Sequence, residues 1–288
     1  MIDQFVDYME LEKNYSPGTI HQYGCDLKLF KGFLKIKDIL GVESGDIRGF
    51  LAHLKRERKY SPTTIARKQA TLRAFYKFCR KEKKVSDNPM EFIDTPKLPE
   101  RQPVYLTDEE RKNIFDMVNS LTYTIRGKRD YAIISLLYYA GLRVSELVGL
   151  NAGDMRREGD SVTLKIIGKG NKERKVPLRI EAQEAINTWL QNRPSTAESN
   201  SAIFINTKTK KRLTARTVQF LIKRITEQAD IKKKITPHKF RHTFGTRLLQ
   251  QGANLVDIQV LLGHASLNTT RIYTHTNPAR LEEAVSKL

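Results

Sequence analysis

The chemistry-bearing residues of this 288-residue chain gather near its C-terminal end. Four of its six histidines lie in the last 51 residues, and the pentad His238-Lys-Phe-Arg241-His242 places three side chains on one face of a helix that Thr236 and Pro237 are predicted to begin. Arginine offers a planar fork of donors that matches two phosphate oxygens. Histidines at this spacing also suit zinc, but a lysine stands where a zinc protease has its glutamate, and the arginine would repel a cation. The pentad therefore favours an anion over a metal.

Further motifs carry residues suited to the same chemistry. Arg143 follows a helix break at Gly141, Lys169 lies in a glycine-rich turn, and Tyr273 comes nine residues after His264. Taken singly, each has an ordinary explanation, since surface arginines, solvated turn lysines and buried tyrosines are common. In chain order the motifs are Gly141-Leu-Arg143-Val-Ser-Glu-Leu147, Gly168-Lys169-Gly-Asn-Lys-Glu-Arg174, the His238 pentad, Leu262-Gly-His264 and Tyr273.

This series resembles the motifs of the tyrosine recombinases, and the residues within each motif are similar to those of the Xer group, which resolves chromosome dimers. The resemblance covers essentially the whole chain, including two Ser-Pro-x-Thr helix starts at Ser16 and Ser61. It implies an enzyme that cuts and rejoins DNA through a covalent 3′-phosphotyrosyl intermediate, in which the energy of the broken bond is stored. It also implies a SAM-like core-binding domain followed by a DNA breaking-rejoining catalytic domain.

Six catalytic residues follow from the resemblance: Tyr273 as nucleophile, Arg143 and Arg241 as a phosphate clamp, Lys169 as general acid, His238 as general acid/base and His264 as a hydrogen-bond donor to the phosphate. Phosphoryl transfer needs fixed donors for the charge that builds on the non-bridging oxygens. Since these cations supply that charge, no metal, ATP or other cofactor is expected. Lys172 lies close to Lys169, and motif position alone favours Lys169 as the acid.

Net charge points to a polyanionic partner. The chain has 51 lysines and arginines against 32 acidic residues, a net charge of +19. Twelve lysines and arginines and only two glutamates lie within residues 51–84, a helix-turn-helix-like stretch with aromatic residues on its other face. Nucleic acid is the commonest partner of so basic a protein. We therefore predict nucleic acid, double-stranded DNA on the family resemblance, with phosphate contacts from residues 51–84.

Composition also argues against several other classes of protein. Hydrophobic residues make up 39% of the chain, which is enough for a packed core. The longest apolar run, residues 131–142, is too short to cross a bilayer, and the first residues lack a signal-peptide pattern. Cys25 and Cys79 are far apart and form no CxxC pair. We expect a cytoplasmic, nucleoid-associated protein with no disulfide and no membrane contact.

The chain is predicted to form two domains that are mainly α with a small antiparallel β element (α+β). Residues 1–94 have the pattern of a helical bundle and core-binding domain. Residues 95–104 contain prolines and no apolar period, as expected of a linker, and residues 105–288 form the catalytic domain.

Within the second domain, local signals predict particular elements. A capping box at Thr107 begins a helix, and an apolar helix covers about residues 128–139. Alternating apolar residues at 162–166, a glycine-rich turn and residues 174–178 predict a β-hairpin with a basic tip. The chain beyond about residue 214 is expected to be helical.

The last residues, 278–288, form a C-terminal docking helix in this prediction. Its apolar residues are spaced i, i+3, i+4 and i+7: Leu281, Ala284, Val285 and Leu288. So short a helix is marginal alone, so it should dock, either on its own domain or elsewhere. The resemblance implies handover to a neighbouring protomer in a cyclic tetramer on two DNA duplexes, which we favour once DNA is bound. It also allows an accessory translocase as a further partner.

Three other functions remain open at this point: a phage- or mobile-element-type integrase, a strand-relaxing enzyme like the type IB topoisomerases, and a DNA-binding architectural protein without activity. The first hundred residues are used by the helical bundle, which leaves no room for the arm-binding domain of many phage integrases. Compact size argues against a topoisomerase, and the presence of all six catalytic residues argues against an inactive protein.

Overall fold

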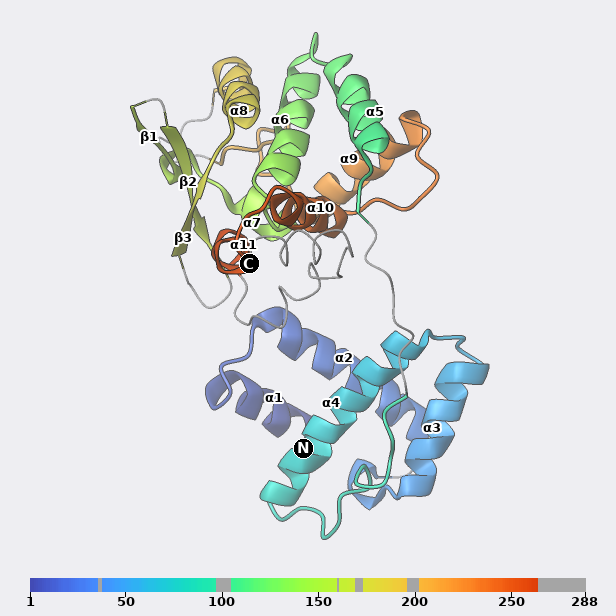
Figure 1. Ribbon diagram of the computed structural model, residues 1–288. Helices are drawn as coiled ribbons and strands as arrows, with labels where there is room; N and C mark the ends of the chain where they lie inside the picture. The colour runs from blue at the N-terminus through green and yellow to red at the C-terminus, as the bar shows by residue number, and fades with distance from the viewer. Residues whose placement is uncertain (36–37, 97–104, 160, 169–172, 196–201, 264–288) are drawn as a thin grey trace, which may run out of the picture. The chain divides into compact units, whose positions relative to one another are not determined.

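The computed structural model describes residues 1–35, 38–96, 105–159, 161–168, 173–195 and 202–263. The chain divides into two compact units, Met1–Arg101 and Gln102–Leu288 (Figure 1). The predicted linker, residues 95–104, lies mostly outside the described ranges. Within those ranges, no helix combines the length and apolar character needed to cross a membrane.

Four α-helices and a 3-10 turn form the described part of the N-terminal unit. They are α1 (Ile2–Leu11), α2 (Pro17–Leu34), α3 (Ser44–Arg56) and α4 (Pro62–Lys81), with a 3-10 turn η1 at Ile39–Gly41. As predicted, Ser16 and Ser61 are N-caps whose hydroxyls accept hydrogen bonds from the backbone N–H three residues on, at 3.4 and 3.3 Å. Proline follows each cap, where its missing N–H costs no helical hydrogen bond. The core contains Leu27, Phe30 and Phe75, all fully buried.

A buried carboxylate joins α2 to the basic helix α4. Asp26 is 3% exposed and accepts hydrogen bonds from Arg67 (2.6 Å), Lys68 (2.7 Å) and Thr71 (3.1 Å). Ten of the twelve lysines and arginines within residues 51–84 are exposed, but Lys68 is buried and Arg73 is half-buried. The basic segment therefore presents most of its charge to solvent, while Asp26 holds Lys68 inside the bundle.

The C-terminal unit is built around α6. Its helices are α5 (Asp108–Asn119), α6 (Ile125–Tyr139), α7 (Val144–Gly149), α8 (Ile180–Asn192), α9 (Ala215–Gln228), α10 (Pro237–Gln250) and α11 (Leu255–Leu262), with a 3-10 turn η2 at Ala152–Asp154. Every residue from Ala132 to Leu137 is fully buried, because α5, α8, α9 and α10 pack against α6. Figure 1 shows α6 between α5 and α8. A helix that is apolar on all sides is expected at such a position.

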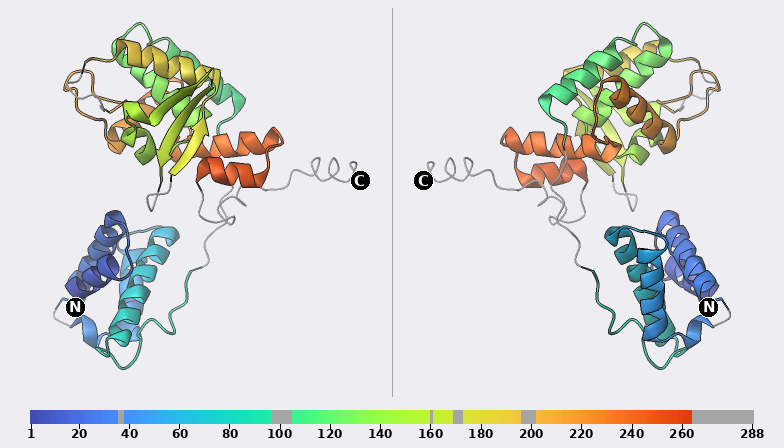
Figure 2. Two further views of the ribbon diagram at one scale, coloured as in Figure 1. Left: turned by 90° about the vertical axis from the view of Figure 1, so that its left-hand side faces the viewer. Right: turned by 90° about the vertical axis from the view of Figure 1, so that its right-hand side faces the viewer.

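A three-stranded antiparallel sheet lies beside these helices. Its strands, in spatial order, are β1 (Met155–Glu158), β2 (Ser161–Ile167) and β3 (Glu173–Pro177). Val162, Leu164 and Ile166 are buried and alternate with more exposed residues, as the sequence pattern predicts. Ile166 pairs with Arg174 across the hairpin. The left view of Figure 2 looks onto the strands, with helices behind and beside them.

The structure confirms the predicted class, mainly α with a small antiparallel element. The predicted hairpin is β2 and β3, but β1 was not predicted. Met155-Arg-Arg-Glu158 has no apolar alternation, and it becomes a strand because Met155 to Glu158 pair with β2. Tertiary pairing here overrides a weak local preference.

Replacing Asp26 with asparagine should destabilise the N-terminal unit by about 3 kcal/mol, because the buried Lys68 would lose its carboxylate partner. Trp189, the single tryptophan, is buried in the C-terminal unit. Urea unfolding of the full chain should therefore show an earlier transition by circular dichroism and an unchanged one by Trp189 fluorescence. The exposed control Asp7→Asn should change neither, and equal unfolding of Asp26→Asn and the native chain would contradict the expectation.

Candidate active site

Three arginines from three different elements meet at the C-terminal end of α11. Arg143 immediately precedes α7, Arg174 lies in β3, and Arg241 is in the second turn of α10. Each donates to a different backbone carbonyl: Arg174 Nε to Leu261 O at 2.8 Å, Arg241 Nη2 to Leu262 O, and Arg143 Nη2 to Gly263 O at 3.1 Å. The last carbonyls of a helix lack helical partners and form the negative end of its dipole, so these cations stabilise the end of α11.

Glu146 on α7 holds the same three arginines together. Its side chain is only 4% exposed. Arg143 donates to the carboxylate from its backbone N–H at 2.8 Å and from Nη1 at 2.7 Å. Arg174 forms a bidentate pair with it, at 2.9 and 2.8 Å, and Arg241 Nη1 lies 3.8 Å from the nearer oxygen. Three guanidinium groups thus face one carboxylate, which leaves the cluster with a surplus of positive charge.

The arginines also keep Glu146 ionised. Burial by itself would raise the pKa of this carboxyl, but hydrogen bonds from Arg174 and from the Arg143 backbone, together with their charges, outweigh burial and lower it. A lowered pKa in the folded state stabilises the fold above the ordinary pKa of a glutamate. That stabilisation is lost only as the pH falls through the lowered value. At neutral pH the carboxylate therefore remains a fixed anchor for the cluster.

A glycine lets α10 approach the loop that carries Arg143. Gly141 has φ near +60°, and a Cβ at this position would lie 2.4 Å from Cδ1 of Phe244 on α10. The carbonyl of Gly141 accepts a hydrogen bond from Arg241 Nη1 at 2.8 Å. The absence of a side chain at Gly141 thus brings Arg241 within reach of the Arg143 loop.

The structure describes three of the six catalytic residues predicted from the sequence. Arg143 and Arg241 belong to one cluster, in which the Arg143 side chain is 30% exposed and that of Arg241 is 6% exposed. His238 is exposed in the first turn of α10. Thr236 occupies the N-cap of that helix and Pro237 begins it, as predicted, although the Thr236 side chain makes no capping hydrogen bond there.

Lys169, His264 and Tyr273 lie outside the described residues, as does Lys172, the alternative to Lys169. Arg143 and Arg241 both bond the end of α11, and His264 follows Gly263 directly in the chain. Among the residues that the structure does describe, no group of three or more histidine, cysteine, aspartate or glutamate side chains is arranged to hold a metal.

Sequence reasoning missed Glu146 and Arg174. Both residues lie inside motifs that the sequence analysis identified, and the local sequence around each contains a pattern that could have indicated its role. Glu146 follows Arg143 by three residues, the spacing of a capping box, and it accepts the Arg143 backbone N–H in that way. Arg174 lies two residues before the buried Val176 on β3 and so shares its face, which turns the arginine side chain toward the interior, where it needs a carboxylate partner.

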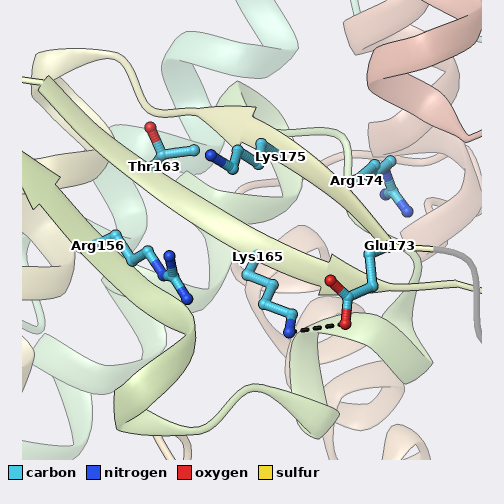
Figure 3. A pocket seen from close by; sticks show the side chains of 6 residues that line it. All are labelled: Arg156, Thr163, Lys165, Glu173, Arg174 and Lys175. Atoms are coloured by element: carbon cyan, nitrogen blue, oxygen red, sulfur yellow. Dashed lines mark ion pairs between the residues drawn. The ribbon is translucent and has the colours of Figure 1, made fainter.

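A cavity of about 290 Å³ lies at the sheet and is lined by Arg156, Thr163, Lys165, Glu173, Arg174 and Lys175. Lys165 and Glu173 form an ion pair across it at 2.7 Å. In Figure 3 the Arg174 side chain points away from the other five. The cavity and the arginine cluster thus lie on opposite sides of β3 at this residue.

Comparison with known protein families finds a matching family for each unit. Residues 104–280 match the phage integrase family, and residues 2–83 match the phage integrase N-terminal SAM-like domain. A protein named tyrosine recombinase XerC from Oceanobacillus iheyensis is 40% identical over 294 residues, covering 99% of this chain and 94% of the relative. Another of the same name from Caldanaerobacter subterraneus is 37% identical, covering 100% and 86%.

Solved structures show the same similarity. The XerH site-specific recombinase, in a post-cleavage complex with its palindromic difH substrate, has a TM-score of 0.79 and 26% identity, covering 99% of this chain and 84% of that one. The XerA recombinase is 30% identical over 99% of this chain and 96% of that one, with a TM-score of 0.54.

A helical unit joined to a sheet-bearing unit with a cationic cluster thus defines an enzyme of the class that cuts and rejoins DNA. The chain belongs to the phage integrase family, the site-specific tyrosine recombinases.

Replacing Gly141 with alanine should lower DNA cleavage about a hundredfold, because a small displacement of α10 moves Arg241 out of place. It should also destabilise the C-terminal unit by about 2 kcal/mol through overpacking against Phe244. Gly149→Ala is the matched control, since a Cβ there meets no atom within 4 Å. Rate constants for covalent adduct formation and Trp189 fluorescence unfolding check both effects, and native-like cleavage by Gly141→Ala would contradict the role of this glycine.

Proposed function

We propose that this recombinase resolves dimers of chromosomes or plasmids by strand exchange at a specific site in double-stranded DNA. The observation that carries the strand-cleavage chemistry is that Arg143 and Arg241 both bond the end of α11, which ends two residues before His264 and is followed further on by Tyr273. Relatives of similar length carry the name XerC, and a related structure is a complex of XerH with its difH substrate.

In the proposed reaction the phenolic oxygen of Tyr273 attacks the scissile phosphorus. A bond forms between tyrosine and the 3′ phosphate, and the bond from phosphorus to the 5′ oxygen breaks. His238 takes the phenolic proton, Lys169 gives a proton to the departing 5′ oxygen, and His264 donates a hydrogen bond to the phosphate. Attack by a 5′ hydroxyl of the second duplex reverses these steps and completes the exchange.

The charge of the arginine cluster fits this chemistry. The phosphodiester carries one negative charge and gathers more on its non-bridging oxygens as the phenolic oxygen attacks. Three guanidinium groups against Glu146 leave a surplus that can balance this charge without a metal. We therefore propose a reaction that needs no metal, ATP or other cofactor.

Residues 1–94 would serve as a core-binding domain joined by the linker 95–104 to the catalytic domain 105–288. Ten exposed lysines and arginines within residues 51–84 favour phosphate contacts by the N-terminal domain. Binding should weaken steeply with salt, since each phosphate contact releases a counterion. We also propose that the protein acts in the cytoplasm, at the nucleoid, because its proposed substrate is chromosomal or plasmid DNA.

Assembly is the second part of the proposal. Residues 278–288 would pass to a neighbouring protomer, and this head-to-tail contact would close a cyclic tetramer on two duplexes. An accessory translocase would act as a further partner that triggers exchange.

Tyr273→Phe should abolish the covalent adduct, since phenylalanine has no nucleophilic oxygen. The test incubates full-length protein with nicked duplexes carrying candidate sites, in EDTA, and detects adducts that survive SDS. Tyr139→Phe, which removes the hydroxyl of a half-buried tyrosine on α6, is the matched control and should form the adduct normally. An adduct with Tyr273→Phe, or a requirement for divalent metal, would refute the proposed chemistry. Relaxation of supercoils without a specific site would instead favour a topoisomerase.

Removing residues 279–288 should diminish strand exchange between two duplexes while leaving the binding of a single site unchanged, because the segment is assigned to the contact between protomers. A native-length control with Glu283→Gln and Lys287→Gln, which keeps the apolar stripe, should recombine normally. Recombination assays on paired sites and gel-shift measurements on single sites give the two readouts. Undiminished exchange by the truncated chain would rule out the handover.

A further inference from the structure

Arg174 is committed entirely to the interior of the cluster. Its side chain is 8% exposed. Nη1 and Nη2 each donate to an oxygen of Glu146, and Nε donates to the carbonyl of Leu261. Arg143, by comparison, is 30% exposed and closer to solvent. This geometry makes Arg174 unsuited to a direct contact with a DNA phosphate.

The contribution of Arg174 is instead to compensate the negative charge of Glu146. Glu146 is buried, and a buried carboxylate requires a nearby cation. With Arg174 in a bidentate pair, Arg143 and Arg241 retain a surplus of positive charge. Without Arg174, the nearest cations to Glu146 would be Arg143 at 2.7 Å and Arg241 at 3.8 Å. The carboxylate would then neutralise part of the charge that faces the phosphate.

We propose that Arg174 is a positioning residue of the strand-cleavage reaction, which serves as the counter-charge of Glu146 and so leaves the positive charge of Arg143 and Arg241 available to the scissile phosphate. This inference rests on the proposed function only for the role of those two arginines as a clamp. The contact of Arg174 with Leu261 adds a second effect, since it fixes β3 to the end of α11.

The proposal predicts a defect that depends on the charge of the substrate. Arg174→Gln should slow covalent adduct formation at saturating protein about a hundredfold. The unbalanced Glu146 would then offset the charge of one clamp arginine, which is comparable to losing one electrostatic donor to the transition state. DNA affinity should change little, since the many contacts along the DNA backbone dominate binding. The defect should shrink to less than about tenfold on a duplex whose scissile phosphate carries a methyl group in place of one non-bridging oxygen, because that group is uncharged.

Three further variants sharpen the test. Arg174→Gln combined with Glu146→Gln should cleave at least about tenfold faster than Arg174→Gln alone, because the pair is coupled and the unbalanced carboxylate is gone. Arg174→Lys keeps the charge but loses the bidentate fork, so it should cleave more slowly than the native protein and clearly faster than Arg174→Gln. Arg179→Gln is the matched control: Arg179 forms a similar fork with Glu181, but at the surface, and its loss should leave cleavage unchanged.

A merely structural role would slow cleavage of the charged and the methylated phosphate equally, and this result would overturn the proposal. The proposal would also be overturned if Arg174→Lys cleaved DNA as slowly as Arg174→Gln. The lysine variant keeps the positive charge, so it tests the proposal even if the glutamine variant fails to fold. Arg143→Gln separates this inference from the proposed function. If Arg143→Gln cleaves normally, or if the native chain forms no adduct through Tyr273, the proposed active site is wrong whatever Arg174 does.

Discussion

The C-terminal unit depends on one buried carboxylate and the arginines around it. Glu146 joins α7, β3 and α10 because each element contributes a guanidinium group to it. The same arginines bond three successive carbonyls at the end of α11. A single carboxylate thus holds α7, β3, α10 and the end of α11 together. The position of Gly263, the last residue before His264, is therefore fixed relative to the arginines. Cations gathered in this way cost nothing to reorganise when a phosphate arrives, which is the condition for electrostatic catalysis.

The same device recurs elsewhere in this very basic chain. Among the residues that the structure describes, three buried carboxylates each face two or more cations: Asp26 with Arg67 and Lys68, Asp130 with Arg129 and Arg224, and Glu146 with its three arginines. A net charge of +19 repels itself in a compact structure. Acidic residues placed inside both relieve this repulsion and orient particular basic side chains. In a protein that binds a polyanion, the few buried acids therefore decide which cations remain available to it.

The hydrophobic core of the C-terminal unit and the arginine cluster are linked through the turn at the end of α6. The buried helix α6 ends at the turn that contains Gly141, and the missing side chain there lets Phe244 of α10 approach the turn. Arg241 bonds the Gly141 carbonyl from the same helix. The packing of α6 against its neighbours, and not only the residues of the cluster, thus sets the distance between Arg143 and Arg241.

Much of the secondary structure of this protein, and some of its candidate site residues, can be predicted from local sequence. Period and capping predict the helix starts at Ser16 and Ser61, and alternation predicts the β2–β3 hairpin, because these signals act between residues a few positions apart. The same holds for Arg143 and Arg241, which short motifs pick out as candidates for phosphate binding. That these motifs share one site is implied by the family resemblance and not by any local pattern.

Tertiary structure alone decided the rest. The strand β1 forms only because β2 pairs with it, and Lys68 is buried only because Asp26 reaches it from another helix. Glu146 and Arg174 are 28 residues apart, and Arg143 and Gly263 are 120 apart. Contacts over such separations have no local pattern, since they depend on how whole elements pack. For this reason the sequence by itself determined which residues could do the chemistry, and the fold decided which charges balance one another around them.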